Sequence, residues 1–171
     1  MDDLARRIVE VALLRGTFTL RSGRTSHYYL DKYLFETQPA ILAAIGQRLK
    51  DHVDANIDRL AGPELGGIAL VTAAVLASGK PAIFVRKSTK EYSTGKQIEG
   101  QLEKNDRILL IEDVVTTGGQ LLDSARVIQD AGAEVVKIVA VVDRQEGGRE
   151  NIEKAGFSFK SLFTKADLGV E

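Results

Sequence analysis

Short apolar runs that alternate with helical segments are the feature of this sequence that most limits its fold. Two of these runs, residues 108–111 and 139–142, are continuously apolar instead of alternating between apolar and polar side chains. A continuous run is typical of a strand buried on both faces, as in parallel sheets covered by helices. The sequence therefore predicts an α/β fold in which a mostly parallel central sheet is flanked by helices.

The expected elements follow from the same patterns. Apolar residues at three- and four-residue steps predict a helix over residues 2–15, and the segment 17–35, rich in Thr, Phe and Tyr, predicts two short strands. Later helices are expected at 39–53, 67–78 and 119–131, and strands at 57–61, 81–86, 107–112 and 135–142. Because ligands of such sheets bind beyond the carboxyl ends of the strands, the loops after strands should carry the function.

Charge and composition exclude several classes of protein. The 23 basic and 24 acidic residues give a net charge of -1, which argues against a nucleic-acid partner. The absence of cysteine excludes thiolate metal sites, disulfides and a cysteine nucleophile. No apolar run approaches the ~20 residues that a membrane-spanning helix needs, and the first residues do not resemble a secretory signal. We therefore expect a cytoplasmic protein with no membrane partner.

The strongest local feature is the end of the run at residues 108–111. Two adjacent carboxylates, Glu112 and Asp113, are followed by Val-Val and then by the turn Thr-Thr-Gly-Gly at residues 116–119, which leads into a helix. Free backbone N–H groups and the helix dipole both favour an anion at such a helix start, and glycine allows close approach. The turn therefore predicts a phosphate site.

The acid pair predicts a different ligand group beside that phosphate. Carboxylates repel a phosphate but suit sugar hydroxyls or a hard metal ion such as Mg²⁺. A phosphate next to a diol is the pattern of a ribose 5-phosphate. The alternative is an ordinary strand–turn–helix unit with capping threonines and solvated acids.

Two further loops carry weaker signals. Residues 86–96 hold four cations, Arg86, Lys87, Lys90 and Lys96, against the single anion Glu91. A mobile cationic loop beside a phosphate site suits a pyrophosphate leaving group, because it excludes water and neutralises charge as the bond breaks; the alternative is a solvated surface loop. The glycine-containing turn at residues 61–67 could hold a second anion through its backbone.

The segment 108–119 resembles the phosphoribosyl pyrophosphate (PRPP) motif of the type I phosphoribosyltransferases. The resemblance implies that family's fold, with PRPP bound by the strand-end turn and by the cationic loop. The implied PRPP-binding residues are Arg86, Lys87, Lys90, Glu112, Asp113, Val114, Val115, Thr116, Thr117, Gly118, Gly119 and Gln120. Lys90, Glu112 and Asp113 are the implied catalytic residues.

Residues 18–31 and 143–148 resemble the orotate phosphoribosyltransferases within that family. Orotate carries a carboxylate, which an arginine at a strand end can bind bidentately, and a flat ring, which tyrosines can flank. The expected orotate-binding residues are Arg21, Tyr28, Tyr29, Thr116 and Arg144. An ion pair with Glu146 is the alternative for Arg144, and strand packing is the alternative for the tyrosines, of which only one can face a given pocket.

The resemblance also implies how the protein works. It implies transfer of the phosphoribosyl group of PRPP to orotate in pyrimidine biosynthesis, with Mg²⁺ as cofactor, held mainly through PRPP and not by protein ligands. It implies one domain whose residues 1–36 and C-terminal tail form a hood over the base, and a homodimer that shares the loop at 87–96. Two alternatives stay open: transfer to another nucleobase, and a non-catalytic PRPP-binding regulator.

Overall fold

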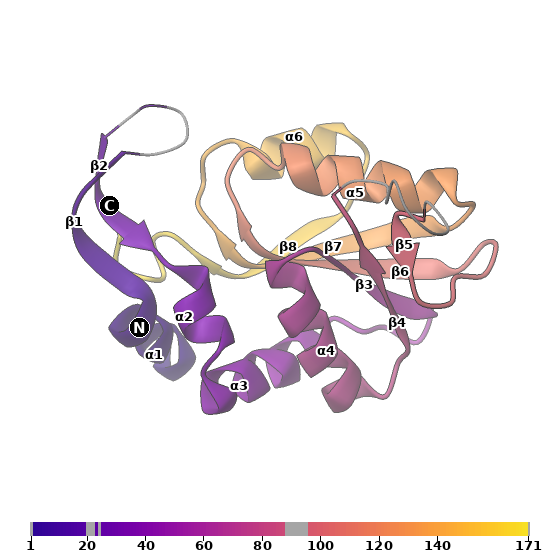
Figure 1. Cartoon of the computed structure of the whole chain (residues 1–171), viewed down its shortest axis with the longest axis horizontal. Helices are drawn as coiled ribbons and strands as arrows, with labels where there is room; N and C mark the ends of the chain where they lie inside the picture. Colours follow the sequence, from indigo (N-terminus) through magenta and orange to yellow (C-terminus); the bar gives the residue numbers. More distant parts are fainter. Residues whose placement is uncertain (1, 20–22, 24, 88–95, 171) are drawn as a thin grey trace.

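A central sheet organises the computed structural model, which describes residues 2–19, 23, 25–87 and 96–170. Within this part of the chain, six strands lie in the order β5–β4–β3–β6–β7–β8 (Figure 1). In that order their bounds are Ile98–Glu99, Ala82–Val85, Arg59–Pro63, Arg107–Val115, Glu134–Asp143 and Phe159–Thr164. All neighbouring pairs are parallel except β4 and β5. The predicted mostly parallel sheet is therefore confirmed.

Helices cover both faces of this sheet. Helices α5 (Gly119–Asp130) and α6 (Gly148–Lys154) lie on one face, and α3 (Pro39–Lys50) and α4 (Gly66–Ser78) lie on the other (Figure 1). The central strand β6 alternates between the two resulting cores: Ile108 and Leu110 pack on the α5 side, and Leu109 and Ile111 on the α4 side. Burial on both faces explains why this run is continuously apolar.

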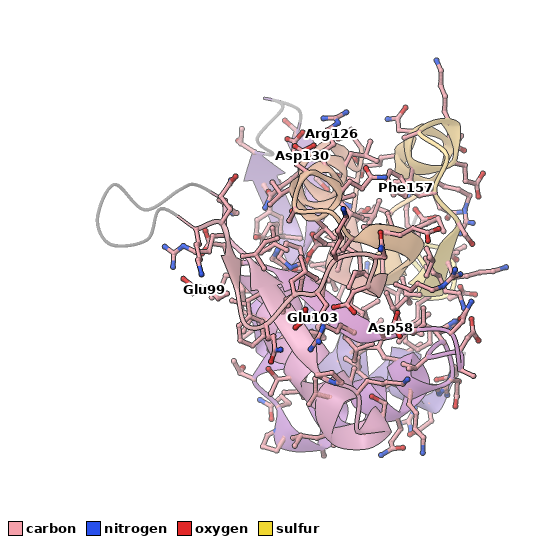
Figure 2. All side chains as sticks on the ribbon, turned by 90° about the vertical axis from the view of Figure 1, so that its right-hand side faces the viewer. Asp58, Glu99, Glu103, Arg126, Asp130 and Phe157 are labelled. Atoms are coloured by element: carbon pink, nitrogen blue, oxygen red, sulfur yellow. The ribbon has the colours of Figure 1, made fainter. Side chains whose placement is uncertain are left out.

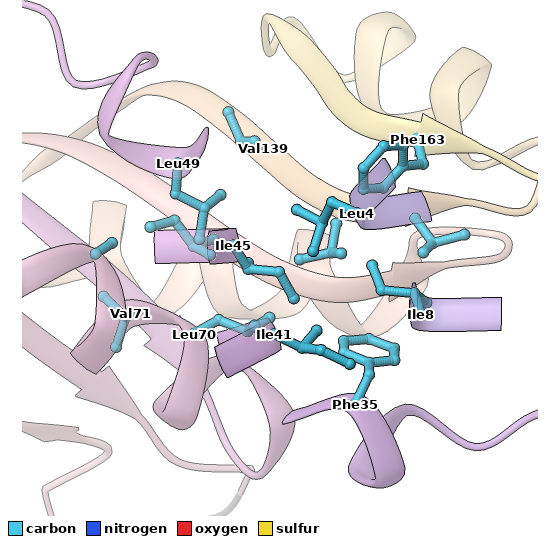
Figure 3. Close-up of a cluster of buried hydrophobic side chains, with 14 of the residues drawn as sticks. Leu4, Ile8, Phe35, Ile41, Ile45, Leu49, Leu70, Val71, Val139 and Phe163 are labelled. Carbon is cyan, nitrogen blue, oxygen red and sulfur yellow. The ribbon is translucent and has the colours of Figure 1, made fainter. Parts of the chain in front are cut away.

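The larger core joins the N-terminal helices to the sheet. Leu4 and Ile8 meet Phe35 and Ile45 beneath Val139 (Figure 3). These side chains are at most 4% exposed. At the outer side of the molecule, charged residues of α5 such as Arg126 and Asp130 are exposed (Figure 2). This apolar-inside pattern is what fixes the N-terminal segment to the sheet.

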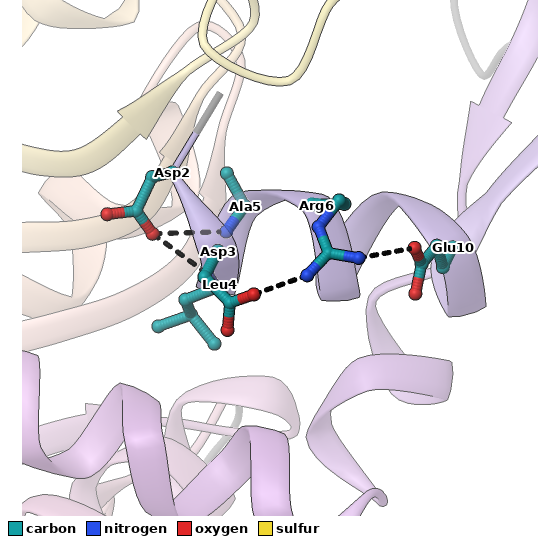
Figure 4. A network of polar contacts seen from close by, with 6 residues as sticks. All are labelled: Asp2, Asp3, Leu4, Ala5, Arg6 and Glu10. Atoms are coloured by element: carbon teal, nitrogen blue, oxygen red, sulfur yellow. Dashed lines mark hydrogen bonds and ion pairs between the residues drawn. The ribbon is translucent and has the colours of Figure 1, made fainter.

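The N-terminal segment begins with helix α1 (Asp3–Ala12), which Asp2 caps by accepting N–H groups from the first turn (Figure 4). The helix ends three residues before the predicted boundary at residue 15. Strand β1 (Leu13–Thr19) starts at once and pairs antiparallel with β2 (Thr25–Leu30), and Leu13 lies opposite Leu30. Pairing in this separate two-stranded sheet therefore overrides the helical periodicity of residues 13–15.

Three other expectations at element level need correction. Residues 32–36 form helix α2 (Lys32–Glu36) and not the end of a strand, since Asp31 caps the segment by accepting the N–H of Tyr33. Strand β6 runs to Val115, three residues beyond the predicted end, and pairs with β7 as far as Asp143. Helix α6 and strand β8 follow β7, which was the last predicted element. None of the helices in the described ranges combines the length and apolarity that crossing a bilayer requires.

Candidate active site

The order of the strands along the chain reverses between β3 and β6. Strand β3 is followed in sequence by β4 on one side and has β6 as its neighbour on the other, and all three run parallel. Such a switch point, at the carboxyl ends of the strands, is where open α/β sheets bind ligands. A cavity of about 390 Å³ lies there, lined by the turns that follow both strands and by residues of the N-terminal segment.

This cavity gathers most of the residues predicted for a phosphate and a sugar. From β6 onward its lining consists of Glu112, Asp113, Val114, Val115, Thr116, Thr117, Gly118, Gly119, Gln120 and Leu121. Tyr29 and Lys87 also line it. Of the other predicted residues that the structure describes, Arg86, Tyr28 and Arg144 do not line it. Arg21 and Lys90 lie outside the described residues.

The start of helix α5 has the features of an anion site. Gly118 is its N-cap, with a φ of +78°, and no side chain caps the helix. A Cβ added at Gly119 would have no atom of the described residues within 4 Å apart from its own helix and chain neighbours, so this glycine faces open space. The first N–H groups of α5 have no intrahelical acceptor, and no side chain of the described residues caps them, so the helix dipole and these donors favour an anion there.

The turn before α5 is held from behind by α6. The Asn151 side-chain amide donates to the carbonyl of Thr117 at 3.0 Å. A Cβ at Gly148 would lie 2.4 Å from the carbonyl oxygen of Thr116, so only glycine permits this approach. Helix α6, which the sequence did not predict, thus fixes the shape of the turn that is predicted to bind phosphate.

The acid pair is buried at the base of the cavity. Glu112 is 9% exposed and Asp113 is 2% exposed, so the alternative of solvated acids is wrong. The carboxylate of Glu112 accepts the N–H of Asp113 at 2.9 Å. Burial raises the pKa of Glu112 well above its usual value, and the nearby charge of Asp113 adds to the rise. Two buried acids that line a cavity are better placed to accept hydrogen bonds from neutral hydroxyl groups of a ligand than from bulk water.

Helix α2 brings two side chains to Asp113 that the sequence did not predict as site residues. The Lys32 ammonium Nζ lies 2.5 Å from Oδ2 of Asp113, and Lys32 also lines the cavity. Glu36, one turn further on, is buried, and its Oε1 has no hydrogen-bond partner among the described residues. Burial raises the pKa of Glu36 to about 8, with a further contribution from the charge of Asp113.

A sequence signal for these residues existed. Asp31 is a favoured N-cap type, and Lys32 and Glu36 stand four residues apart, which places them on one face of a helix. The aromatic content of residues 28–35 favoured a strand instead. Nothing in the sequence pairs Lys32 with Asp113, 81 positions away, because that contact depends on how the N-terminal segment docks on the sheet.

The turn between β3 and α4 forms the opposite wall. Glu64, Leu65 and Gly66 line the cavity, and the peptide bond between Glu64 and Leu65 is cis. An oxygen of Glu64 accepts the backbone N–H of Lys87 at 2.6 Å, which ties this turn to the start of the cationic loop. A Cβ at Gly66 would lie 1.7 Å from Oδ2 of Asp113. The predicted second anion site here therefore has little room at Gly66 and stays a prediction.

The two predicted tyrosines point to different places, as expected for neighbouring strand residues. Tyr29 lines the cavity, whereas Tyr28 packs against Arg144, whose guanidinium lies 5.5 Å from the centre of the Tyr28 ring. Arg144 also forms an ion pair with Glu146 at 2.9 Å. This is the alternative pairing foreseen for Arg144, although the residue is largely buried and not on the surface.

Arg144 is nevertheless fixed directly behind the cavity. Its backbone N–H donates to the carbonyl of Val115 at 2.9 Å, and its Nε is buried with no hydrogen-bond partner in the part of the chain that the structure describes. Arg86 follows strand β4, where its guanidinium lies 3.9 Å from Glu99. Both arginines adjoin residues that line the cavity, Lys87 and Val115, without lining it themselves.

The fold, the switch-point cavity and the acid pair beside an open helix start together define a class of protein that binds a phosphorylated sugar. Residues 34–167 match the phosphoribosyl transferase domain family. Because this match covers most of the chain, the protein belongs to the phosphoribosyl transferase family.

Individual relatives show which members of this family the chain is similar to. The chain is 43% identical to the orotate phosphoribosyltransferase of Pyrococcus horikoshii over 98% of this chain and 92% of that protein. It is 46% identical to the orotate phosphoribosyltransferase of Methanocella arvoryzae over 90% of this chain and 87% of that protein. The crystal structure of Mycobacterium tuberculosis orotate phosphoribosyltransferase superposes with a TM-score of 0.88 at 35% identity, covering 98% of both chains. The same enzyme in complex with PRPP superposes with a TM-score of 0.82 at 34% identity, again covering 98% of both chains.

Proposed function

We propose that this protein is an enzyme that transfers the 5-phosphoribosyl group of PRPP to orotate, releasing pyrophosphate and forming orotidine 5′-monophosphate for pyrimidine biosynthesis. The observation that carries the proposal is the cavity in which a buried acid pair and an uncapped helix start lie side by side. Relatives named for this activity match nearly the whole chain, and a superposable relative binds PRPP.

The geometry supports a division of the PRPP site into two parts. The N–H groups and hydroxyls from Thr116 to Gln120 take the 5-phosphate, because the start of α5 offers donors that no side chain occupies. Glu112 and Asp113 accept hydrogen bonds from the ribose hydroxyls. As the C1′–O bond breaks and its electron pair leaves with pyrophosphate, positive charge builds on the ribose ring, close to this acid pair.

The leaving pyrophosphate is assigned to cations at the cavity mouth. Lys87 lines the cavity, and Arg86 precedes it in the chain. Lys90 is assigned the same role from the family resemblance, as a residue outside the described part of the chain. Mg²⁺, implied by the family resemblance, is proposed to be held mainly through PRPP. When bound, Mg²⁺ would neutralise pyrophosphate oxygens.

The orotate site is proposed at the hood side of the cavity. Tyr29 offers an aromatic face inside it, and Thr116 a hydroxyl. Arg144 and Tyr28 lie together behind Val115, and the buried Nε of Arg144 is a donor for the orotate carboxylate once its pairing with Glu146 rearranges. Arg21 is the remaining proposed contact. The hood, the homodimer that shares residues 87–96 and the cytoplasmic location rest on the sequence and the family resemblance.

Consumption of orotate tests the function directly. The purified protein is supplied with orotate, uracil or hypoxanthine, with and without PRPP and Mg²⁺, and the ultraviolet absorbance of the base is followed. We expect orotate to be consumed only when both PRPP and Mg²⁺ are present, with pyrophosphate formed in equal amount. Consumption of another base in its place would assign a different substrate. PRPP binding without consumption of any base would favour the non-catalytic regulator.

A further inference from the structure

Lys32 is the cation that the structure places against the buried acid pair. Its Nζ lies 2.5 Å from Oδ2 of Asp113, and its side chain is 33% exposed, with its end in the cavity. Burial acts to lower the pKa of Lys32, but the charge of Asp113 and the hydrogen bond to it outweigh burial and leave the pKa raised. The ammonium therefore stays charged in the presence of its partner.

The surroundings of Asp113 explain why a cation is needed there. Oδ2 of Asp113 and Oε1 of Glu36 both lie within 3.0 Å of the point where a Cβ of Gly66 would stand. Glu112 adds a third carboxyl from the adjacent position of β6. A buried carboxylate without a positive partner is costly, because its charge is removed from water. Lys32 is the positive charge that offsets this effect.

Lys32 also restricts the orientation of the Asp113 carboxylate. One oxygen, Oδ1, accepts the N–H of Val114, and the other, Oδ2, faces Lys32. A carboxylate oxygen has a second lone pair, so Oδ1 can still accept a hydroxyl proton, whereas Oδ2 is buried. With both oxygens held, the carboxylate presents fixed acceptor directions to the cavity, and a bound sugar need not order it.

We propose that Lys32 is a positioning residue, which holds the Asp113 carboxylate oriented for the ribose hydroxyls of PRPP. This inference rests on the proposed function only in assigning those hydroxyls to Asp113. It adds a residue of the N-terminal helix α2 to a sugar site otherwise built from the sheet. A purely structural role, in which the ion pair only docks α2 on β6, is the competing explanation.

Substitution of Lys32 separates these explanations. PRPP binding is measured by calorimetry in the presence of Mg²⁺, and steady-state kinetics are measured with orotate, for Lys32→Met, Lys32→Arg and the exposed control Lys50→Met. For Lys32→Met we expect the Kd and KM of PRPP to rise on the order of 10-fold, the range of one hydrogen bond to a charged group. The kcat should change less than about 3-fold and the KM of orotate should not change, as for a lost ground-state contact. Lys32→Arg should recover part of the PRPP affinity, and Lys50→Met should match the wild type.

A double-mutant cycle with Asp113→Asn tests whether Lys32 acts through Asp113. If it does, Lys32→Met should weaken PRPP binding by less than about 2-fold in the Asp113→Asn background, because effects of residues that act as a unit are not additive. Full additivity would overturn the inference and indicate that Lys32 contacts PRPP itself. A lower Tm of Lys32→Met with unchanged PRPP affinity would also overturn it, in favour of the structural role.

Different experimental results would contradict the proposed function and the proposed role of Lys32. Wild-type protein that binds PRPP but consumes no orotate would contradict the reaction and leave the calorimetric test of Lys32 intact. Wild-type protein that turns over orotate, together with a Lys32→Met variant of equal PRPP affinity, would contradict only the role of Lys32. A wild type that does not bind PRPP would overturn both.

Discussion

The two turns that enter α4 and α5 look alike in sequence but are built for different purposes. Each follows a parallel strand, carries a glycine pair and starts a helix that no side chain caps. At Gly66 of the first turn, an added Cβ would lie 1.7 Å from the Asp113 carboxylate. At Gly119 of the second turn, an added Cβ would contact only its own helix and chain neighbours among the residues that the structure describes.

This difference shows that a glycine pair before a helix has two distinct physical causes. In the first turn, Gly66 lets the protein pack against itself and makes room for Asp113 and Glu36. In the second turn, glycine keeps the helix start open toward the cavity and permits the positive φ of Gly118. The space beside Gly66 is therefore filled by protein, whereas the space beside Gly119 is open toward the cavity.

The largest expected effect comes from Gly66→Ala. The new methyl group must displace the buried Asp113 carboxylate, and crowding of this kind costs about 1–3 kcal/mol of stability. We expect a lower free energy of unfolding in urea and PRPP turnover reduced by about 10²-fold or more, since an acceptor of the ribose hydroxyls is displaced. Wild-type stability together with wild-type turnover would show that the first turn is not packed as described.

Gly119→Ala should affect ligand binding alone. The methyl group points into open space, so the free energy of unfolding should stay within about 0.5 kcal/mol of the wild type, as for most surface substitutions. The methyl group would occupy room that the phosphate needs, and the KM of PRPP should rise by about 10- to 100-fold, the range of one or two charged hydrogen bonds. Gln129→Ala, exposed at the far end of the same helix, is the matched control. An unchanged KM of PRPP would place the phosphate elsewhere.

The smallest expected effect concerns Glu36, beside the closed turn. Its pKa of about 8 lies above the usual value of 4.5, so the folded state keeps a proton that the unfolded state releases between these pH values. The contribution of Glu36 to the free energy of unfolding therefore falls as the pH rises from about 4.5 to 8. Glu36→Gln removes this loss. We expect the Tm of the variant minus that of the wild type to be on the order of 3 °C larger at pH 8 than at pH 5, since 1 kcal/mol shifts Tm by ~2–4 °C at this size.

Thermal unfolding followed by circular dichroism at several pH values measures this difference. A Tm difference that stays constant from pH 5 to pH 8 would contradict the raised pKa of Glu36. A Tm difference that decreases as the pH rises would mean that the pKa of Glu36 is lowered and not raised.

The sequence predicted the parts of the molecule that depend on local pattern. Continuous apolar runs identified the central strands, and the acids followed by Thr-Thr-Gly-Gly identified the turn that lines the cavity. Both signals arise because backbone conformation and burial at those positions allow few residue types. Tyr28 and Tyr29 were likewise expected to face different ways, and they do.

What the sequence could not predict depends on contacts between distant segments. Lys32 reaches Asp113 only because α1 and α2 pack on the same core as the sheet. The apolar periodicity of helix α1 continues beyond Ala12, but the chain forms strand β1 there instead. Pairing with β2 stabilises these residues more than another helical turn would. Helix α6 is a short helix of seven residues whose pattern is too brief for recognition, yet it holds the turn before α5 through Asn151.

The crystal structure of the protein with PRPP and Mg²⁺ tests the central claim most directly. The account predicts the 5-phosphate within hydrogen-bonding distance of the N–H groups at the start of α5, and the ribose hydroxyls against Glu112 and Asp113. PRPP bound with its 5-phosphate at the turn before α4 or outside the cavity, with the start of α5 left without a phosphate, would contradict it.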